Sequence, residues 1–129
     1  MIEQPVARGT DESLRGYTGA PRLAADESVA DRTDLAAVKD LYQVVNVKLD
    51  KSGGLTEALA LAREVRALGL EVMVGCMAGT SLAMAPGMVV GQLAEFVDLD
   101  GPLLHADDRE HGIPYDRGLM GLPLPVLWG

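Results

Sequence analysis

The sequence is poor in several residue types, and each shortage argues against a class of structure or partner. One cysteine in 129 residues allows no internal disulfide, which fits a reducing cytosol. Aromatic residues make up 4% of the chain, and no run of about 18 apolar residues predicts a membrane span. Eleven basic residues face 19 acidic ones. The resulting net charge of −8 argues against a nucleic-acid partner, which needs clustered Lys and Arg.

The remaining composition is that of a globular domain. Hydrophobic residues account for 48% of the chain and charged residues for 23%. The length suits one modest domain. No basic segment followed by an apolar one opens the sequence, so we expect no signal peptide. The 15 glycines and few aromatics predict many tight turns around a core of Ala, Val, Leu and Met.

Short apolar runs alternate with helical segments along the chain. The runs that predict strands are Met1–Ile2, Arg22–Ala25, Val44–Leu49, Glu71–Met77 and Leu93–Leu99. Helical spacing is found at Asp31–Tyr42, at Leu55–Leu68, and at Ser81–Leu93, where Pro86 and Gly87 interrupt it. The clearest helix, Leu55–Leu68, has one apolar face made of Leu55, Leu59, Ala62, Val65 and Leu68. This alternation predicts βα units around a parallel sheet.

A polar or reactive residue lies near the end of each predicted strand, where the apolar run gives way to a loop. These residues are Glu3, Asp26, Lys48, Cys76 and Asp98. In parallel α/β folds the carboxyl ends of the strands carry ligands and catalytic groups, so these side chains are expected to converge on one rim. A charged residue after a strand is also often only the first solvated residue of a loop. The spacing of these five residues alone does not identify a reaction.

Two acids and a lysine are the first candidates for chemistry. Glu3 and Asp26 end successive strands and could share a Mg²⁺ ion, which prefers oxygen ligands; two unrelated surface acids are the alternative. Lys48 ends an alternating strand, with Val45 and Val47 on one face and Asn46 and Lys48 on the other. Beside a metal and other cations the pKa of Lys48 would be depressed, as suits a base. The alternative is a lysine that reaches from the sheet edge into solvent. Lys51 is expected to be a solvated or supporting charge.

Three further features leave alternatives open. Asp98 and Asp100 are two residues apart at a strand end and suit an ammonium group or a metal, or else form a turn. Ser52-Gly53-Gly54 before a helix resembles an anion cradle, although a plain turn is favoured. Cys76 follows an apolar run and is expected to be packed, since no histidine nearby would activate it as a nucleophile.

A resemblance connects these pieces. The motifs IEQP (2–5), ADES (25–28), NVKLDKSGGLTEAL (46–59), GCM (75–77) and DLDGP (98–102) resemble the enolase superfamily. Within it they are similar to the muconate-lactonizing-enzyme subgroup and its dipeptide epimerases, from residue 1 to about residue 129. The resemblance implies an α/β fold: the C-terminal part, about strands 5–8, of a (β/α)8 TIM-type barrel over residues 1–103. Residues 104–129 would form an irregular tail that packs against a capping domain.

The resemblance also implies roles. Glu3 and Asp26 match Mg²⁺ ligands, Lys48 matches an acid/base lysine, and Asp98 and Asp100 match a pair that holds the α-ammonium of a dipeptide. Lys51 and Cys76 are secondary candidates. The implied reaction is Mg²⁺-dependent epimerisation of a dipeptide of the L-Ala-D/L-Glu type, by α-proton abstraction through an enediolate.

The departures from the family pattern set further expectations. The chain has no Lys-x-Lys motif for the opposing base, no first Mg²⁺ ligand and no capping domain. We therefore expect a fragment that is inactive alone and that pairs with a missing half, self-associates or is poorly stable. A non-catalytic, self-associating half-barrel is one alternative. Another is a different reaction of the superfamily, such as cycloisomerisation, o-succinylbenzoate synthesis or racemisation. The Asp98-x-Asp100 pair argues against the first two, because those substrates carry no ammonium group.

Overall fold

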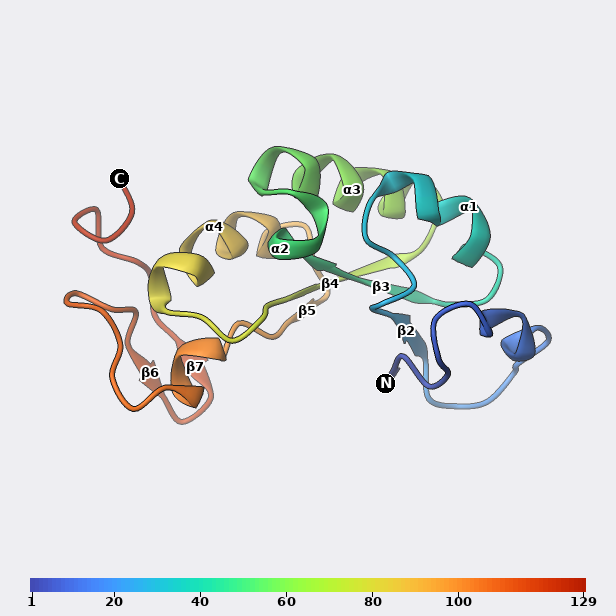
Figure 1. Ribbon diagram of the computed structural model, residues 1–129, viewed down its shortest axis with the longest axis horizontal. Coiled ribbons are helices and arrows are strands. Elements are labelled where there is room, and N and C mark those ends of the chain that lie inside the picture. Colours follow the sequence, from blue (N-terminus) through green and yellow to red (C-terminus); the bar gives the residue numbers. More distant parts are fainter.

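Five parallel strands form the main sheet of the computed structural model, which describes residues 1–129 (Figure 1). Their order in the sheet is their order in the sequence, and each neighbouring pair is parallel. The strands are β1 (Ile2–Glu3), β2 (Leu23–Ala25), β3 (Val44–Lys48), β4 (Glu71–Gly75) and β5 (Phe96–Val97). The fold is thus the predicted α/β half-barrel, with one strand more than the four that strands 5–8 would supply.

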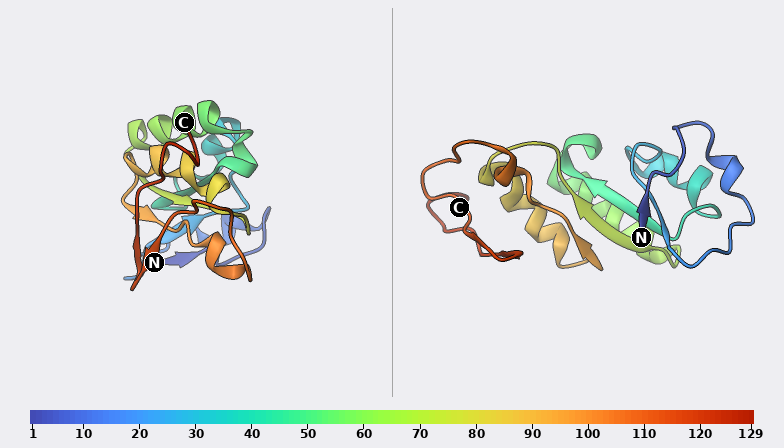
Figure 2. Two further views of the ribbon diagram at one scale, coloured as in Figure 1. Left: turned by 90° about the vertical axis from the view of Figure 1, so that its left-hand side faces the viewer. Right: turned by 90° about the horizontal axis from the view of Figure 1, so that it is seen from below.

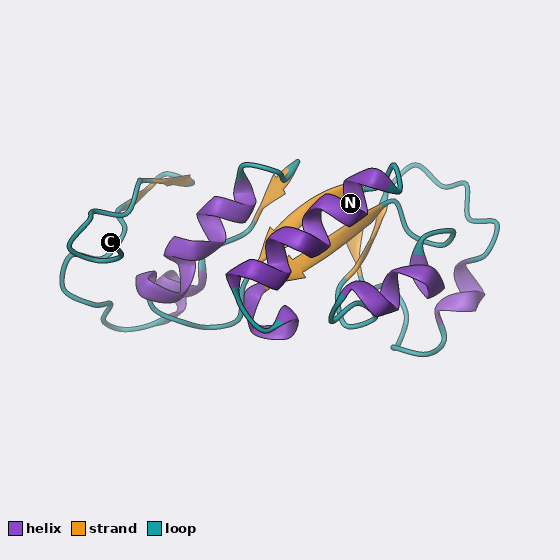
Figure 3. Cartoon of the chain, turned by 90° about the horizontal axis from the view of Figure 1, so that it is seen from above, coloured by secondary structure: helices purple, strands orange, loops and turns teal.

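The α-helices lie over one face of this sheet (Figure 3). The α-helices are α1 (Leu35–Val38), α2 (Leu49–Ser52), α3 (Leu55–Ala67) and α4 (Ser81–Gly91). Short 3-10 helices are η1 (Asp11–Leu14), η2 (Arg32–Asp34) and η3 (Gly101–Leu104), and a hairpin joins β6 (Tyr115–Asp116) to β7 (Leu119–Met120). None of these helices combines the length and apolar character of a membrane span. Figure 2 shows the α-helices gathered on one side and the C-terminal segment extending past the end of the sheet.

Several predicted boundaries change in the structure. The segment expected to be helical over 31–42 contains only η2 and α1, and the strand expected over 93–99 shortens to β5. β3 ends at Lys48 because α2 begins at Leu49. The buried face of α3 is centred on Ala58, Leu61, Ala62 and Val65, whereas Leu68 is 43% exposed. α4 begins at Ser81 as predicted and runs through Pro86.

The alternation of β3 separates the two faces of the sheet. Val45 and Val47 are fully buried and belong to the main core of 20 residues between sheet and helices. Val44 belongs instead to a small cluster on the opposite face, with Ala24 and Met73. Because successive side chains alternate between faces, Lys48 shares the face of Val44 and stands at the carboxyl end of the strand. β-Branched valines suit this pleated, buried position.

The first turn of α4 is capped by a residue far away in the sequence. Thr80 is in the N-cap position, but its side chain makes no capping hydrogen bond. Asp108 caps the helix instead, since its Oδ1 accepts from the backbone N–H of Ser81 at 2.9 Å and its Oδ2 accepts from the Ser81 hydroxyl. The buried Ser81 hydroxyl in turn accepts from the backbone N–H of Ile113 at 2.8 Å. The segment after η3 is therefore tied to the start of α4.

Replacing Asp108 by Ala is expected to lower the free energy of unfolding by about 1 kcal/mol, the usual effect of losing a helix cap. The matched Thr80→Ala variant should change it much less, because the Thr80 side chain caps nothing. Urea unfolding of both variants measures the difference. Equal effects of the two substitutions would contradict the assignment of the cap.

The same contact should depend on pH. Partial burial acts to raise the pKa of Asp108, but the hydrogen bonds from Ser81 outweigh it and hold this pKa below its ordinary value. A depressed carboxyl pKa means that the contact contributes fully above pH ~4 and is lost as pH falls through the folded-state pKa. Hydrogen exchange at the Ser81 and Ile113 amides should therefore accelerate in acid beyond the intrinsic change.

Candidate functional site

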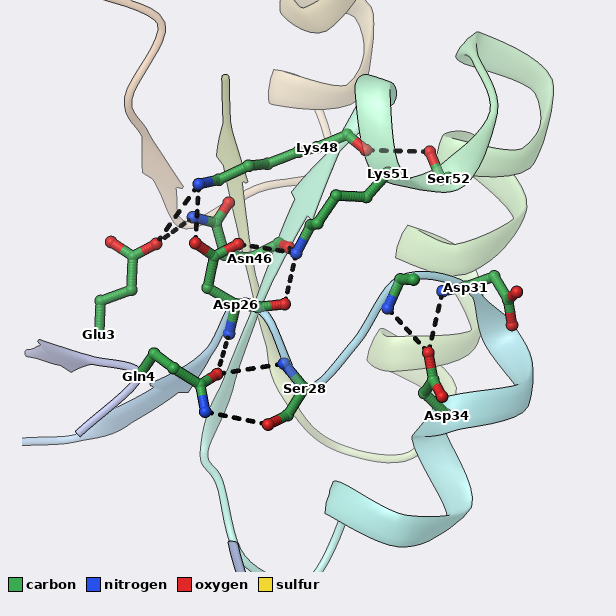
Figure 4. A network of polar contacts seen from close by, with 11 residues as sticks. Glu3, Gln4, Asp26, Ser28, Asp31, Asp34, Asn46, Lys48, Lys51 and Ser52 are labelled. Atoms are coloured by element: carbon green, nitrogen blue, oxygen red, sulfur yellow. Dashed lines mark hydrogen bonds and ion pairs between the residues drawn. The ribbon is translucent and has the colours of Figure 1, made fainter. Parts of the chain in front are cut away.

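Two lysines and two acids meet at the carboxyl ends of β1, β2 and β3 (Figure 4). Lys48 Nζ lies 2.7 Å from Asp26 Oδ2 and 3.9 Å from Glu3 Oε1. Lys51 Nζ lies 2.7 Å from the other Asp26 oxygen and 3.2 Å from the backbone oxygen of Asn46. Each Asp26 oxygen thus has its own ammonium partner. The strand ends named from the sequence bring Glu3, Asp26 and Lys48 into one cluster.

The charges of this cluster are set by burial and by one another. Burial acts to raise the pKa of Asp26, but the hydrogen bonds from Lys48 and Lys51 outweigh it and lower that pKa. Burial acts to lower the pKa of Lys48, but the bond to Asp26 and the nearby charge of Glu3 raise it overall. This direction is opposite to the depressed pKa expected for Lys48 beside a metal ion. That expectation assumed cations as neighbours, and the structure places carboxylates there.

Of the two roles expected for Lys51, a solvated or a supporting charge, the structure has the supporting one. Its side chain is 13% exposed, like that of Lys48, and its ammonium group is bound to Asp26. Burial lowers the pKa of Lys51, and the positive charge of Lys48 adds to this effect. α2 explains the placement, because it turns the chain immediately after Lys48 and brings Lys51 back over β2. Sequence periodicity did not predict this short helix.

Gln4 holds the loop that carries Asp26. Its Oε1 accepts hydrogen bonds from the backbone N–H groups of Asp26 (2.9 Å) and Ser28 (3.2 Å). Its Nε2 donates to the Ser28 hydroxyl at 2.9 Å and to Tyr42 at 3.2 Å. The φ of +38° at Gln4 is uncommon for a residue with a side chain, and these bonds hold it there. Sequence reasoning missed Gln4, whose one signal was its place in the IEQP motif.

The acids suit part of a magnesium coordination sphere. Glu3 and Asp26 both offer carboxylate oxygens, the ligand type that Mg²⁺ prefers, and Mg²⁺ often uses one or two carboxylates with waters. Both also line an open pocket of about 690 Å³ with Gln4, Pro5, Arg8 and Glu27. No group of three or more His, Cys, Asp or Glu side chains is placed to hold a metal. The two carboxylates are nevertheless ligands of the type that Mg²⁺ prefers, and Lys48 Nζ lies between them.

The acidic pair after β5 lies farther along the same rim. Partial burial raises the pKa of Asp98, and the neighbouring Asp100 charge adds to the rise, while Lys48 opposes it. Both acids line a pocket of about 390 Å³ with Tyr115 and Arg117. The Tyr115 hydroxyl donates to the backbone oxygen of Leu99 at 2.6 Å, which ties the β6–β7 hairpin to the residue between the two acids. Tyr115 was not predicted, because it is distant in sequence.

Two secondary features have simpler explanations. Partial burial raises the pKa of the Cys76 thiol, the Gly101 backbone opposes this, and Asp98 and Asp100 add to the rise. A protonated thiol is a poor nucleophile. Gly53 and Gly54 form a turn, since both backbone N–H groups donate to Leu49, at 3.1 and 2.9 Å. The positive φ angles of these two residues (+86° and +116°) explain the choice of glycine, and the anion cradle is wrong.

Comparison with known proteins places this arrangement in a family. Residues 1–123 match the family described as enolase C-terminal domain-like. The chain belongs to the enolase C-terminal domain-like family. A solved enolase family member from Agrobacterium tumefaciens, described as having homology to dipeptide epimerases and as binding sodium and L-Ala-L-Glu, superimposes with a TM-score of 0.95. It is 50% identical and covers 99% of this chain, which covers 39% of it.

Curated relatives of this enolase-family chain are racemases and epimerases. N-acetyl-D-glutamate racemase of Pseudoalteromonas is 48% identical over the whole chain, which covers 41% of that relative. L-Ala-D/L-Glu epimerase of Escherichia coli K12 is 43% identical over 95% of the chain, which covers 38% of that enzyme. The chain thus spans about two fifths of the length of the curated relatives that it matches.

Proposed function

We propose that this chain forms part of a Mg²⁺-dependent epimerase that acts on a dipeptide of the L-Ala-D/L-Glu type. The observation that carries the proposal is Lys48, placed between the carboxylates of Glu3 and Asp26 on the rim of a parallel half-barrel. A relative 43% identical to it is an L-Ala-D/L-Glu epimerase, and a similar structure holds L-Ala-L-Glu. The reaction class is proton abstraction α to a carboxylate, through an enediolate.

In this proposal Lys48 exchanges a proton with the α-carbon of the substrate. Asp26 and Glu3 hold Lys48 as an ammonium, the form that delivers a proton. Removing a proton requires the neutral amine, and separation of Lys48 from these two carboxylates favours that form. Glu3 and Asp26 would hold Mg²⁺, which when bound supplies positive charge that stabilises negative charge on the substrate carboxylate. Lys51 remains on Asp26 and keeps that side chain oriented.

Asp98 and Asp100 are proposed to bind the α-ammonium of the dipeptide. Partial burial and the neighbouring Asp100 charge raise the pKa of Asp98. A bound cation would stabilise both carboxylates in their charged form. A second candidate reaction is racemisation of an N-acyl glutamate, favoured by the 48% identity to N-acetyl-D-glutamate racemase. That substrate has an acetylated nitrogen and no ammonium. The two candidates therefore make different use of this acidic pair.

The pair Asp98→Asn and Asp100→Asn should separate these candidates. If the substrate is a dipeptide, the double variant should raise KM for L-Ala-L-Glu about 10-fold or more, since charge-assisted hydrogen bonds are lost. Turnover of N-acetylglutamate should change little. Steady-state kinetics with both substrates measures the ratio of the two activities, in a chimera in which this chain replaces the matching segment of the Escherichia coli epimerase. A variant that lowers both activities equally would contradict ammonium recognition by this pair.

The division of the chain is also part of the proposal. Residues 1–103 would form the barrel part, and residues 104–129 a tail that packs on a capping domain outside this chain. The tail carries exposed Leu119, Leu122, Leu124 and Val126, all more than half exposed, and β1 at the sheet edge is exposed as well. Open edges and apolar side chains of this kind favour association with a missing half or with a second copy.

A chimera tests the function. The matching 122-residue segment of the Escherichia coli epimerase is replaced by this chain, and epimerisation of L-Ala-L-Glu is followed by α-proton exchange in D₂O with Mg²⁺. The chimera is expected to be active. The 129-residue chain alone is expected to show no turnover and to associate in light scattering. A folded but inactive chimera would refute the proposed function, and turnover by the isolated chain would refute its dependence on a second half.

A further inference from the structure

Asn46 is the one buried side chain with an unpartnered polar atom. It lies in the middle of β3, is 1% exposed, and shares the open face of the sheet with Val44. Its Nδ2 donates to Glu3 Oε1 at 2.6 Å, while its Oδ1 has no hydrogen-bond partner. A carboxylate only accepts hydrogen bonds, so the amide nitrogen must face Glu3 and the oxygen must face away. A buried acceptor without a partner is costly, and the orientation therefore calls for a reason.

The bond reaches across a whole strand. Glu3 is on β1, at the edge of the sheet, and its register partner on β2 is Ala24. Strands β1 and β3 are therefore about 9–10 Å apart, twice the spacing of neighbouring strands. The small Ala24 side chain leaves room for Glu3 to extend over β2 toward Asn46. Because the Glu3 side chain is 35% exposed, it would otherwise have solvent-directed conformations to choose from.

Gly75 makes the position of the Asn46 amide possible. Gly75 is at the end of β4, in register with Lys48. A Cβ atom at this position would lie 2.5 Å from Asn46 Oδ1 and 2.7 Å from Nδ2. Such distances are too short for any side chain, so an alanine here would push the amide away. Gly75 therefore contributes by leaving space for the Asn46 amide.

We propose that Asn46 is a positioning residue that holds the Glu3 carboxylate in the gap beside Asp26 and Lys48, and that Gly75 leaves room for it to do so. Asn46 touches no reacting atom in this account and acts through Glu3. The inference rests on the proposed function only in treating Glu3 as a Mg²⁺ ligand. Residues that orient a metal ligand typically contribute 10–100-fold to metal affinity.

The experiment titrates the 129-residue chain with Mg²⁺ and follows binding by NMR. Asn46→Ala and Gly75→Ala are each expected to weaken Mg²⁺ binding about 10-fold or more. In the double variant the alanine at position 75 meets no amide, so its affinity should equal that of Asn46→Ala alone. Gly91→Ala is the matched control, since a Cβ there would make only ordinary contacts of 3.6 and 3.8 Å. Thermal unfolding of each variant reports any purely structural effect.

A metal-free measurement keeps the inference separate from the proposed function. The side-chain amide protons of Asn46 should exchange slowly with solvent, and Glu3→Ala should accelerate this exchange. Slow, Glu3-dependent exchange in a chain that binds no Mg²⁺ would support the positioning of Glu3 and would contradict a Mg²⁺ site formed by Glu3 and Asp26 within this chain. Fast exchange in the unmodified chain would overturn the inference. So would variants that lose thermal stability while binding Mg²⁺ as tightly as the unmodified chain.

Discussion

Replacing Lys48 by Met in the chimera with the Escherichia coli epimerase is expected to lower epimerisation of L-Ala-L-Glu at least about 100-fold. A positioned acid or base contributes about 10²–10⁴-fold to the rate of a proton transfer, and methionine keeps the side-chain length without the amine. Lys48 is the one lysine that lies between the two proposed metal ligands. Exchange of the substrate α-proton in D₂O measures the loss for each epimer separately.

Two controls sharpen this result. Lys39→Met removes an exposed lysine on the helical side of the sheet and should leave the rate unchanged. Lys51→Met removes the second partner of Asp26. It should lower the free energy of unfolding and leave the rate of substrate α-proton exchange at saturating substrate nearly unchanged. A Lys48→Met chimera that retains more than a tenth of the activity would exclude Lys48 as the acid/base.

Replacing Asp26 by Ala is expected to destabilise the isolated chain by about 3 kcal/mol. The Asp26 side chain is 9% exposed and lies between two ammonium groups whose side chains are each 13% exposed. Removing the carboxylate takes away the nearest acid from both ammonium groups and leaves Lys48 with only the more distant Glu3, at 3.9 Å. Breaking a buried pair typically costs about 3–5 kcal/mol. The free energy of unfolding in urea measures the change.

The interpretation depends on charge, which a second substitution tests. Combining Asp26→Ala with Lys51→Met should recover part of the lost stability, because one uncompensated ammonium is then gone. Glu12→Ala, which breaks an exposed pair with Arg15, is the control and should have no measurable effect. A loss below about 1 kcal/mol for Asp26→Ala would show that water screens the cluster and that the pair is weak.

Local pattern predicted much of the fold. The alternation in β3 assigned Val45 and Val47 to one face and Asn46 and Lys48 to the other, and the structure has this arrangement. The Leu55–Leu68 helix was predicted within one residue of α3, and Gly69 ends it with a φ of +78°. These features depend on neighbours within a few residues, which a sequence displays directly. The roles of Glu3, Asp26, Lys48, Asp98 and Asp100 in binding and catalysis stay predictions.

The protonation state of Lys48 could not be predicted in the same way. The sequence shows that Lys48 ends a strand, but not that Asp26 Oδ2 lies 2.7 Å from its ammonium group. That distance depends on how β2 and β3 align and on the loop that Gln4 holds in place. A lysine with cations as neighbours loses its proton more easily, and one with carboxylates keeps it. The direction in which the pKa of Lys48 shifts therefore depends on tertiary contacts.

By itself the sequence determined the parallel α/β architecture and the set of residues at the carboxyl ends of the strands, because side-chain periodicity and the alternation of strands with helices are displayed by short stretches of sequence. Only the tertiary structure decided which of those side chains meet. Lys51 pairs with Asp26, Asp108 caps α4, and Gly75 admits the Asn46 amide through contacts between residues 25 to 29 positions apart in the chain. Such contacts depend on strand register and on the turns between elements, which no short sequence window contains.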